Sequence, residues 1–165
     1  MILNAVFALI MVELLVVGWI DLKTCKISNR WVVANFLISI GLHMAFRDVY
    51  PLTWETLIFP LGFIAIGFIL YLLNIMGAGD SKFLASLFLI IPLQYHLMFF
   101  EKLVLSTVAV GATMLMFRIM RNARTLKAYY LSRYWAGIKD TLRSRFSYAP
   151  VICVAWMLMG FILWK

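Results

Sequence analysis

Long apolar runs occupy most of this chain, and short polar or charged stretches separate them. Six windows contain few charges, and each is close to the roughly 20 residues that an α-helix needs to cross a bilayer. These windows are Ile2–Ile20, Trp31–Phe46, Leu57–Met76, Phe83–Phe100, Leu103–Met120 and Ala149–Trp164. The pattern predicts an all-α, polytopic membrane protein with about six transmembrane helices. No repeat or linker divides residues 1–165, which are expected to form a single integral membrane domain.

Composition strengthens the membrane assignment. Of the 165 residues, 65% are apolar and 13% are charged, whereas soluble domains average roughly 45–50% and about 25%. These values exclude a soluble domain and a disordered tail, and the length leaves no room for a separate soluble catalytic domain. The two cysteines, Cys25 and Cys153, do not form a C-x-x-C pair. No disulfide, metal site or cofactor is therefore predicted.

Positive charge is concentrated in three of the predicted connections. Of the 15 Lys and Arg residues, all but Arg47, Lys102 and Lys165 lie after the first, third or fifth window or in its last few residues. The other twelve are Lys23, Lys26, Arg30, Lys82, Arg118, Arg121, Arg124, Lys127, Arg133, Lys139, Arg143 and Arg145. By the positive-inside rule, these three connections are cytoplasmic and both termini are outside. The net charge of +8 is thus mainly a consequence of topology.

Eight of these cations lie in one segment, at about residues 118–148. Apolar and aromatic residues recur there every three to four positions, and tyrosines and a tryptophan interleave with the basic residues. This spacing favours a basic amphipathic segment that lies on the cytoplasmic surface and contacts anionic lipid headgroups. A plain extension of the fifth helix is the second interpretation. Nucleic-acid binding is the least favoured.

The seven acidic residues differ sharply in their surroundings. Four are interpreted as ordinary loop or surface charges, namely Asp48, Glu55, Glu101 and Asp140. Glu13 lies near the middle of the first window, where an ionised carboxylate is costly. One interpretation is a neutral carboxyl that is bonded to Asn35, Ser39 or Thr107. The other is a role near the active site or in proton supply.

Asp21 and Asp80 are the candidate catalytic residues. Asp21 follows the first apolar window, and Asp80 precedes the fourth. The topology puts both at the cytoplasmic edge of the membrane, where packing can bring them together. Two carboxylates that share one proton have separated pKa values. The charged one can then deprotonate water while the protonated one polarises a peptide carbonyl.

Neighbouring residues form a supporting motif around the second aspartate. Gly77 and Gly79 allow close approach of a substrate backbone and unusual backbone angles. Each aspartate also has a lysine two residues later, Lys23 or Lys82. These lysines either favour the charged carboxylates or extend to the interface as membrane anchors. A lone G-x-G-D is a weak signal, but its combination with a second interfacial aspartate is much stronger.

Around these residues the sequence resembles the type IV prepilin peptidases, which are membrane aspartic proteases of the G-x-G-D type, and it is most similar to the short form associated with Tad or Flp pili. In that family an aspartate is followed six residues later by Ile-Pro-Asn. Here Asp21 is followed by Ile27, Ser28 and Asn29, with serine in place of proline. The pattern Gly-x-Gly-Asp-x-Lys is matched in full by Gly77, Gly79, Asp80 and Lys82. The run Phe146–Pro150 is similar to the cluster that precedes the family's last span.

The resemblance implies a peptidase of the bacterial inner membrane that acts in pilus assembly or protein secretion. It implies cleavage of the short basic leader of prepilins or pseudopilins on the cytoplasmic side, with Asp21 and Asp80 as the catalytic pair. Longer members carry a cytoplasmic insertion with two C-x-x-C pairs, and many also methylate the new N-terminus. This chain lacks that insertion, so N-methylation is not assigned.

Two other function classes remain as alternatives. A small transporter or channel subunit would use Glu13, Asp21 and Asp80 as a proton or cation path, but only Glu13 lies deep within a span, and no inverted repeat is visible. A non-catalytic scaffold of a secretion or pilus machine would retain the fold without the chemistry. His43 and His96 fall near the outer ends of predicted helices and are not assigned to catalysis.

Overall fold

The computed structural model describes the chain except for residues 1, 25, 74–75, 143–147 and 164–165. Its elements are α1 (Ile2–Thr24), α2 (Asn29–Ala45), α3 (Trp54–Leu72), α4 (Ala78–Ile90), the 3₁₀ helix η1 (Leu93–Tyr95), α5 (His96–Arg121), α6 (Ala123–Leu131), α7 (Trp135–Leu142) and α8 (Ala149–Leu163). The described residues contain helices and no strands. The predicted all-α class is confirmed.

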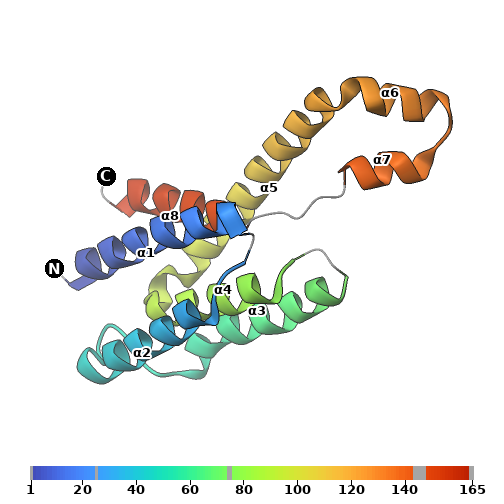
Figure 1. Cartoon of the computed structure of the whole chain (residues 1–165). Coiled ribbons are helices and arrows are strands. Elements are labelled where there is room, and N and C mark those ends of the chain that lie inside the picture. The colour runs from blue at the N-terminus through green and yellow to red at the C-terminus, as the bar shows by residue number, and fades with distance from the viewer. Residues whose placement is uncertain (1, 25, 74–75, 143–147, 164–165) are drawn as a thin grey trace.

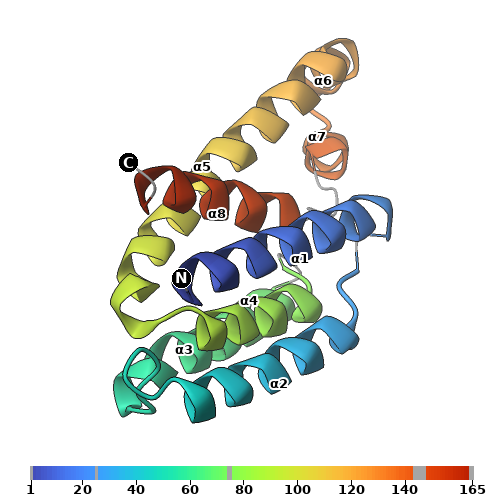
Figure 2. The same cartoon turned by 90° about the vertical axis from the view of Figure 1, so that its left-hand side faces the viewer.

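The helices form two layers, as Figures 1 and 2 show. One layer holds α2, α3 and α4, and the other holds α1, α5 and α8. The short helix α4 lies in the middle, and almost every side chain from Asp80 to Ile90 is buried. Its Phe83, Leu84 and Leu87 belong to one apolar core with side chains from α1 and α8. This apolar contact holds the two layers together.

Successive long helices run in alternate directions, so the two termini lie at the same end of the bundle (Figure 1). The other end, here called the carboxylate end, carries the C-terminus of α1 and the N-termini of α4 and α8. This alternation is expected of a chain that crosses a membrane repeatedly. It also brings segments that are far apart in the sequence to one end.

The fourth predicted window is wrong as a single helix. Helix α4 ends at Ile90, and α5 begins at His96 and includes the whole fifth window, which was expected to start at Leu103. Pro92 has no backbone N–H and disfavours helical geometry at Ile91, whose ψ is 130°. The hydropathy of the run does not reveal this break, because hydropathy values describe side chains and not backbone hydrogen bonds.

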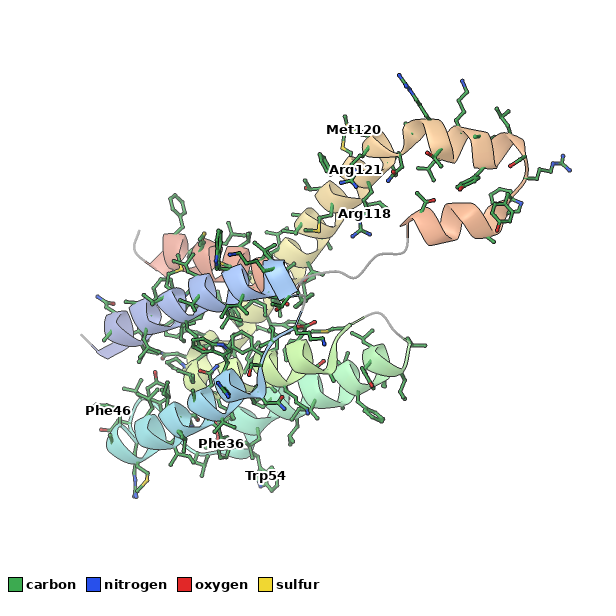
Figure 3. All side chains as sticks on the ribbon, viewed as in Figure 1. Phe36, Phe46, Trp54, Arg118, Met120 and Arg121 are labelled. Carbon is green, nitrogen blue, oxygen red and sulfur yellow. The ribbon has the colours of Figure 1, made fainter. Side chains whose placement is uncertain are left out.

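Length and composition qualify three helical segments as membrane spans, namely Leu3–Thr24, Trp54–Leu72 and Leu93–Arg121. Helix α8 is apolar but shorter, and α2 and α4 have 17 and 13 residues, below the roughly 20 that a full crossing needs. Six spans with both termini outside therefore stay a prediction. Large apolar side chains such as Phe36 and Trp54 point away from the bundle, as expected for a surface that meets lipid (Figure 3).

The predicted basic segment is divided among three helices, and its contact with lipid stays a prediction. Residues 118–121 continue α5, and α6 and α7 then form a helical hairpin to one side of the bundle (Figures 1 and 2). Arg133, at the turn, has a φ of 55°. Three large aromatic side chains near the turn are exposed, namely Tyr130, Tyr134 and Trp135. Arg118 and Arg121 lie on the last turn of α5, where the hairpin begins (Figure 3).

Candidate active site

Asp21 and Asp80 lie at the carboxylate end of the bundle, one from each layer. Asp21 is in the last turn of α1, and Asp80 is in the first turn of α4. Their exposed fractions are 2% and 8%. The charge of Asp21 acts on Asp80 and raises its pKa. The structure thus brings together the two carboxylates that the sequence singles out.

The start of α4 fixes the Asp80 carboxyl. The backbone N–H of Gly77 donates to Asp80 Oδ2 at 3.3 Å, and the Asp80 N–H donates to the Gly77 carbonyl at 3.1 Å. Burial is the main cause that raises the pKa of Asp80 to about 6, and the charge of Asp21 raises it further, while the Gly77 N–H opposes both. A carboxyl with this pKa can carry a proton near neutral pH.

The start of α8 supplies a donor to the other carboxylate. The backbone N–H of Ala149 donates to Asp21 Oδ2 at 3.3 Å, although the two residues are 128 positions apart. The first N–H groups of a helix have no partner within the helix, so α8 offers Asp21 a donor without disturbing its own hydrogen bonds. No role for Ala149 was predicted from the sequence. Only the Phe146–Pro150 cluster pointed to this segment, and Phe146 and Ser147 lie outside the described residues.

Tyr148 is a further site residue that the sequence reasoning missed. Burial raises the pKa of its phenol, Thr107 opposes this shift, and the charge of Asp80 adds to it, so the side chain lies within electrostatic range of Asp80. Its hydroxyl is 2.9 Å from Thr107 Oγ1 on α5. Tyr148 therefore contacts α5 in one layer and lies near Asp80 of the other layer. No local sequence signal identified it beyond the same aromatic cluster.

The two motif glycines each pack closely against another part of the protein. A Cβ at Gly79 would lie 3.0 Å from the carbonyl oxygen of Ile27, and a Cβ at Gly77 would lie 3.1 Å from Asp80 Oδ2. The missing side chains thus make room for the protein itself. None of the described glycines has a positive φ, so the expected unusual backbone angles are absent there.

The remaining motif residues lie on the surface around the carboxylates. Lys23, Lys82 and Asn29 are exposed. Lys23 Nζ stands 4.5 Å from the centre of the Trp19 ring, an arrangement that suits an anchor at the membrane interface. Ser28 caps α2, because its Oγ accepts a hydrogen bond from the Arg30 N–H at 3.3 Å. The serine that replaces the expected proline thus starts the helix in another way.

The two histidines lie at the other end of the bundle. His43 is in the last turn of α2, and His96 is the first residue of α5. His43 Nδ1 is 2.9 Å from the Ser39 carbonyl, and His96 Nε2 is 2.8 Å from the Ile91 carbonyl. Among the described residues, no group of three or more His, Cys, Asp or Glu side chains is placed to hold a metal ion. Both histidines bond to the local backbone.

Comparison with known proteins adds an independent line of evidence. The sequence model of the type IV leader peptidase family matches residues 8–164, a range that includes Asp21 and Asp80. The chain belongs to the type IV leader peptidase family. No curated protein and no solved structure matched the chain. Membership makes this a leader-peptidase-like protease and confirms the family that the two sequence motifs suggested.

Proposed function

We propose that this leader peptidase is a membrane aspartic endopeptidase. It removes the short leader of type IV prepilins, including Flp-type pilins, at the cytoplasmic face of the bacterial inner membrane. One observation carries the proposal. Asp21 and Asp80, from different helices, are both buried at one end of the bundle, and their charges interact. The family match supports the substrate class.

The proposed chemistry divides the two roles between the carboxyls. Asp80, with its raised pKa, carries the shared proton and donates it to the oxygen of the scissile carbonyl. Asp21, which accepts a hydrogen bond from the Ala149 N–H, takes a proton from the attacking water. Attack of the water gives a tetrahedral diol intermediate. As its C–N bond breaks, Asp21 gives its proton to the leaving amine nitrogen and Asp80 takes a proton from a diol hydroxyl, which leaves a free carboxyl and a free amine. These steps require only water and the two side chains.

The proposed orientation puts the carboxylate end in the cytoplasm. Twelve of the 15 basic residues lie after the first, third and fifth apolar windows or in their last few residues, and such an excess marks cytoplasmic connections. A prepilin has an apolar helix after its leader, so it can reach Asp21 and Asp80 laterally within the bilayer. Cys25, which lies outside the described residues, should react with a membrane-impermeant maleimide only from the cytoplasmic side. Labelling only from outside would invert the topology.

Anionic lipid is the proposed partner of the α6–α7 hairpin. Tyr130, Tyr134 and Trp135 are more than half exposed, and Arg124, Lys127 and Arg133 are exposed on the same hairpin. Aromatic rings and basic side chains together suit the headgroup layer of an anionic leaflet. Quenching of Trp135 fluorescence by headgroup-labelled lipid, in a protein whose other tryptophans are replaced, should be strong in anionic vesicles and weak in neutral ones. Equal quenching in both would contradict this.

A cleavage assay tests the proposed function. The purified protein in vesicles is given a prepilin with its leader, and the shortened product is identified by mass. We expect a single cut at the end of the leader, on substrate that is embedded in the same bilayer. A prepilin that lacks the leader should remain unchanged. If the wild-type protein leaves the prepilin intact under all lipid and pH conditions, the scaffold alternative replaces the peptidase.

Cleavage should depend on pH through Asp80. The pKa of this carboxyl is raised from 3.8 to about 6, and the proposed role needs its protonated form. The rate constant should therefore fall as pH rises above about 6, by roughly tenfold per unit, because each unit reduces the protonated fraction tenfold. Single-turnover cleavage measured against pH tests this. A rate that keeps rising with pH up to 8 would assign the acid role to another group.

The same pKa shift also predicts the sign of a stability change. The folded state binds the Asp80 proton more tightly than the unfolded state, because its pKa is higher in the folded protein. The contribution to stability is complete below about 3.8 and is lost as pH rises through about 6. In an Asp80→Asn variant this part of the pH dependence of unfolding should disappear.

A further inference from the structure

A buried polar chain joins the two helices that carry Asp21 and Asp80. Asn35 on α2 donates from Nδ2 to Ser86 Oγ on α4 at 3.3 Å, and Ser86 Oγ donates to the Phe83 carbonyl at 2.7 Å. Asn35 is fully buried, and Ser86 is 4% exposed. On the other side, the Asn35 side chain lies within electrostatic range of the Glu13 carboxyl on α1, without a hydrogen bond between them in the structure. The chain therefore crosses from one layer of the bundle to the other.

The acceptors in this chain outnumber its donors. Glu13 is 7% exposed. Both of its carboxyl oxygens and Asn35 Oδ1 lack a hydrogen-bond donor among the described residues. Three neighbouring acceptors cannot satisfy one another, and an ionised carboxylate is strongly disfavoured at this position within an apolar helix. One proton on Glu13 removes the buried charge and turns one carboxyl oxygen into a donor to Asn35 Oδ1, so that of the three atoms only the second Glu13 oxygen still lacks a donor.

The depth of this chain matches the positions of the aspartates. Glu13 precedes Asp21 by eight residues, and Ser86 follows Asp80 by six. At 1.5 Å per residue, these offsets are about 12 Å and about 9 Å along two helices that run in opposite directions. A link between Glu13, Asn35 and Ser86 thus sets the register of α1 against α4 about two turns below the two aspartates.

We propose that protonated Glu13 donates a hydrogen bond to Asn35 Oδ1 and so fixes α1 against α2 and α4. Glu13 is then a positioning residue for Asp21 and Asp80. This inference rests on the proposed function for its effect on cleavage, but the hydrogen bond itself does not. Apolar packing specifies helix register less sharply than a buried and hydrogen-bonded polar link, which helps to select a single arrangement. The layers carry one aspartate each, so this register decides the geometry of the pair.

Two substitutions of Glu13 separate positioning from proton chemistry. Glu13→Leu removes the donor, and it should lower kcat by about tenfold or more with little change in KM, because a misplacement of about 1 Å can reduce a rate about 100-fold. Glu13→Gln keeps a donor for Asn35 Oδ1 and should cleave within about twofold of the wild-type rate. If Glu13→Gln is as inactive as Glu13→Leu, the carboxyl exchanges protons, and the positioning role is wrong.

Asn35→Leu tests whether the two side chains act as a unit. It should reproduce the loss seen in Glu13→Leu, and the double variant should lose no more than either single variant. Additive losses would show independent roles and would overturn the proposed link. Val6→Ala, which removes a buried side chain near the other end of α1, is the packing control. It should lower the melting temperature without changing kcat.

A distance measurement tests the same link without any substrate. Spin labels replace Leu15 on α1 and Phe68 on α3, which are exposed and belong to opposite layers, after both native cysteines are changed to serine. Double electron–electron resonance should give a narrow distance distribution for wild type and Glu13→Gln. It should give a broader or shifted one for Glu13→Leu. Identical distributions in all three proteins would overturn the inference, whatever the protein cleaves.

Discussion

Replacing Asp21 or Asp80 with asparagine should abolish leader cleavage, with a loss of at least about 1,000-fold for each variant. Positioned acid–base groups typically contribute about 100-fold to 10,000-fold, and here one missing carboxyl removes both the shared proton and the base. The amide has nearly the same shape and can still accept a hydrogen bond from the Gly77 or Ala149 N–H. The fold should therefore survive. Single-turnover cleavage in vesicles measures the loss.

Asp48→Asn is the matched control for both variants. Asp48 is an exposed carboxylate in the loop between α2 and α3, at the other end of the bundle. Its amide variant should cleave at the wild-type rate. All three variants should be extracted and purified in similar yield and should unfold within a few degrees of wild type. If Asp21→Asn or Asp80→Asn cleaves as fast as Asp48→Asn, the two carboxyls are not the catalytic pair.

Hydropathy predicted most helices because burial in lipid dominates their energetics. Helices α1, α2, α3 and α8 coincide with predicted windows to within a few residues. The boundary between α4 and α5 was missed because Pro92 acts through the backbone, which a count of apolar residues does not register. The α6–α7 hairpin was only partly foreseen, since its turn at Arg133 has no glycine or proline to mark it.

The sequence identified the two aspartates but not the groups around them. Asp21 and Asp80 stand out because charges are rare in this chain and both fall at predicted helix ends. Ala149 donates through its backbone, and any residue type except proline offers the same N–H. Tyr148 is one of seven tyrosines. Its position near Asp80 depends on how α8 packs against α1 and α5, which no local pattern contains.

The polar partner of Glu13 could also not be chosen from the sequence alone. The sequence offered Asn35, Ser39 and Thr107 as partners for a neutral carboxyl. In the structure, the Asn35 side chain interacts with Glu13, Ser39 donates to the Leu89 carbonyl, and Thr107 donates to the Leu103 carbonyl. The choice among polar partners on other helices depends on the rotation of each helix about its axis. That rotation follows from the packing of whole layers.

The close contact between α3 and α4 predicts a large loss of stability when Gly67 is replaced. Gly67 on α3 is buried, and a Cβ there would overlap Ser81 Oγ and Cβ on α4. Gly67→Ala should therefore force the helices apart and lower the free energy of unfolding by about 1–3 kcal/mol, the usual range for overpacking. Ser81 follows Asp80 directly, so the displacement also reaches the site. Thermal unfolding in detergent, followed by circular dichroism, measures the change.

Gly62→Ala is the matched control for Gly67→Ala, because it should change stability in the opposite direction or not at all. Gly62 lies on the same helix, and a Cβ there would meet nothing within 4 Å. Alanine is favoured over glycine inside a helix by about 1 kcal/mol, so this variant should be as stable as wild type or more stable. Adding Ser81→Gly to Gly67→Ala removes both overlapping atoms and should restore much of the lost stability. If Gly67→Ala unfolds at the same temperature as Gly62→Ala, then α3 and α4 are not in close contact, and Asp80 is not held from that side.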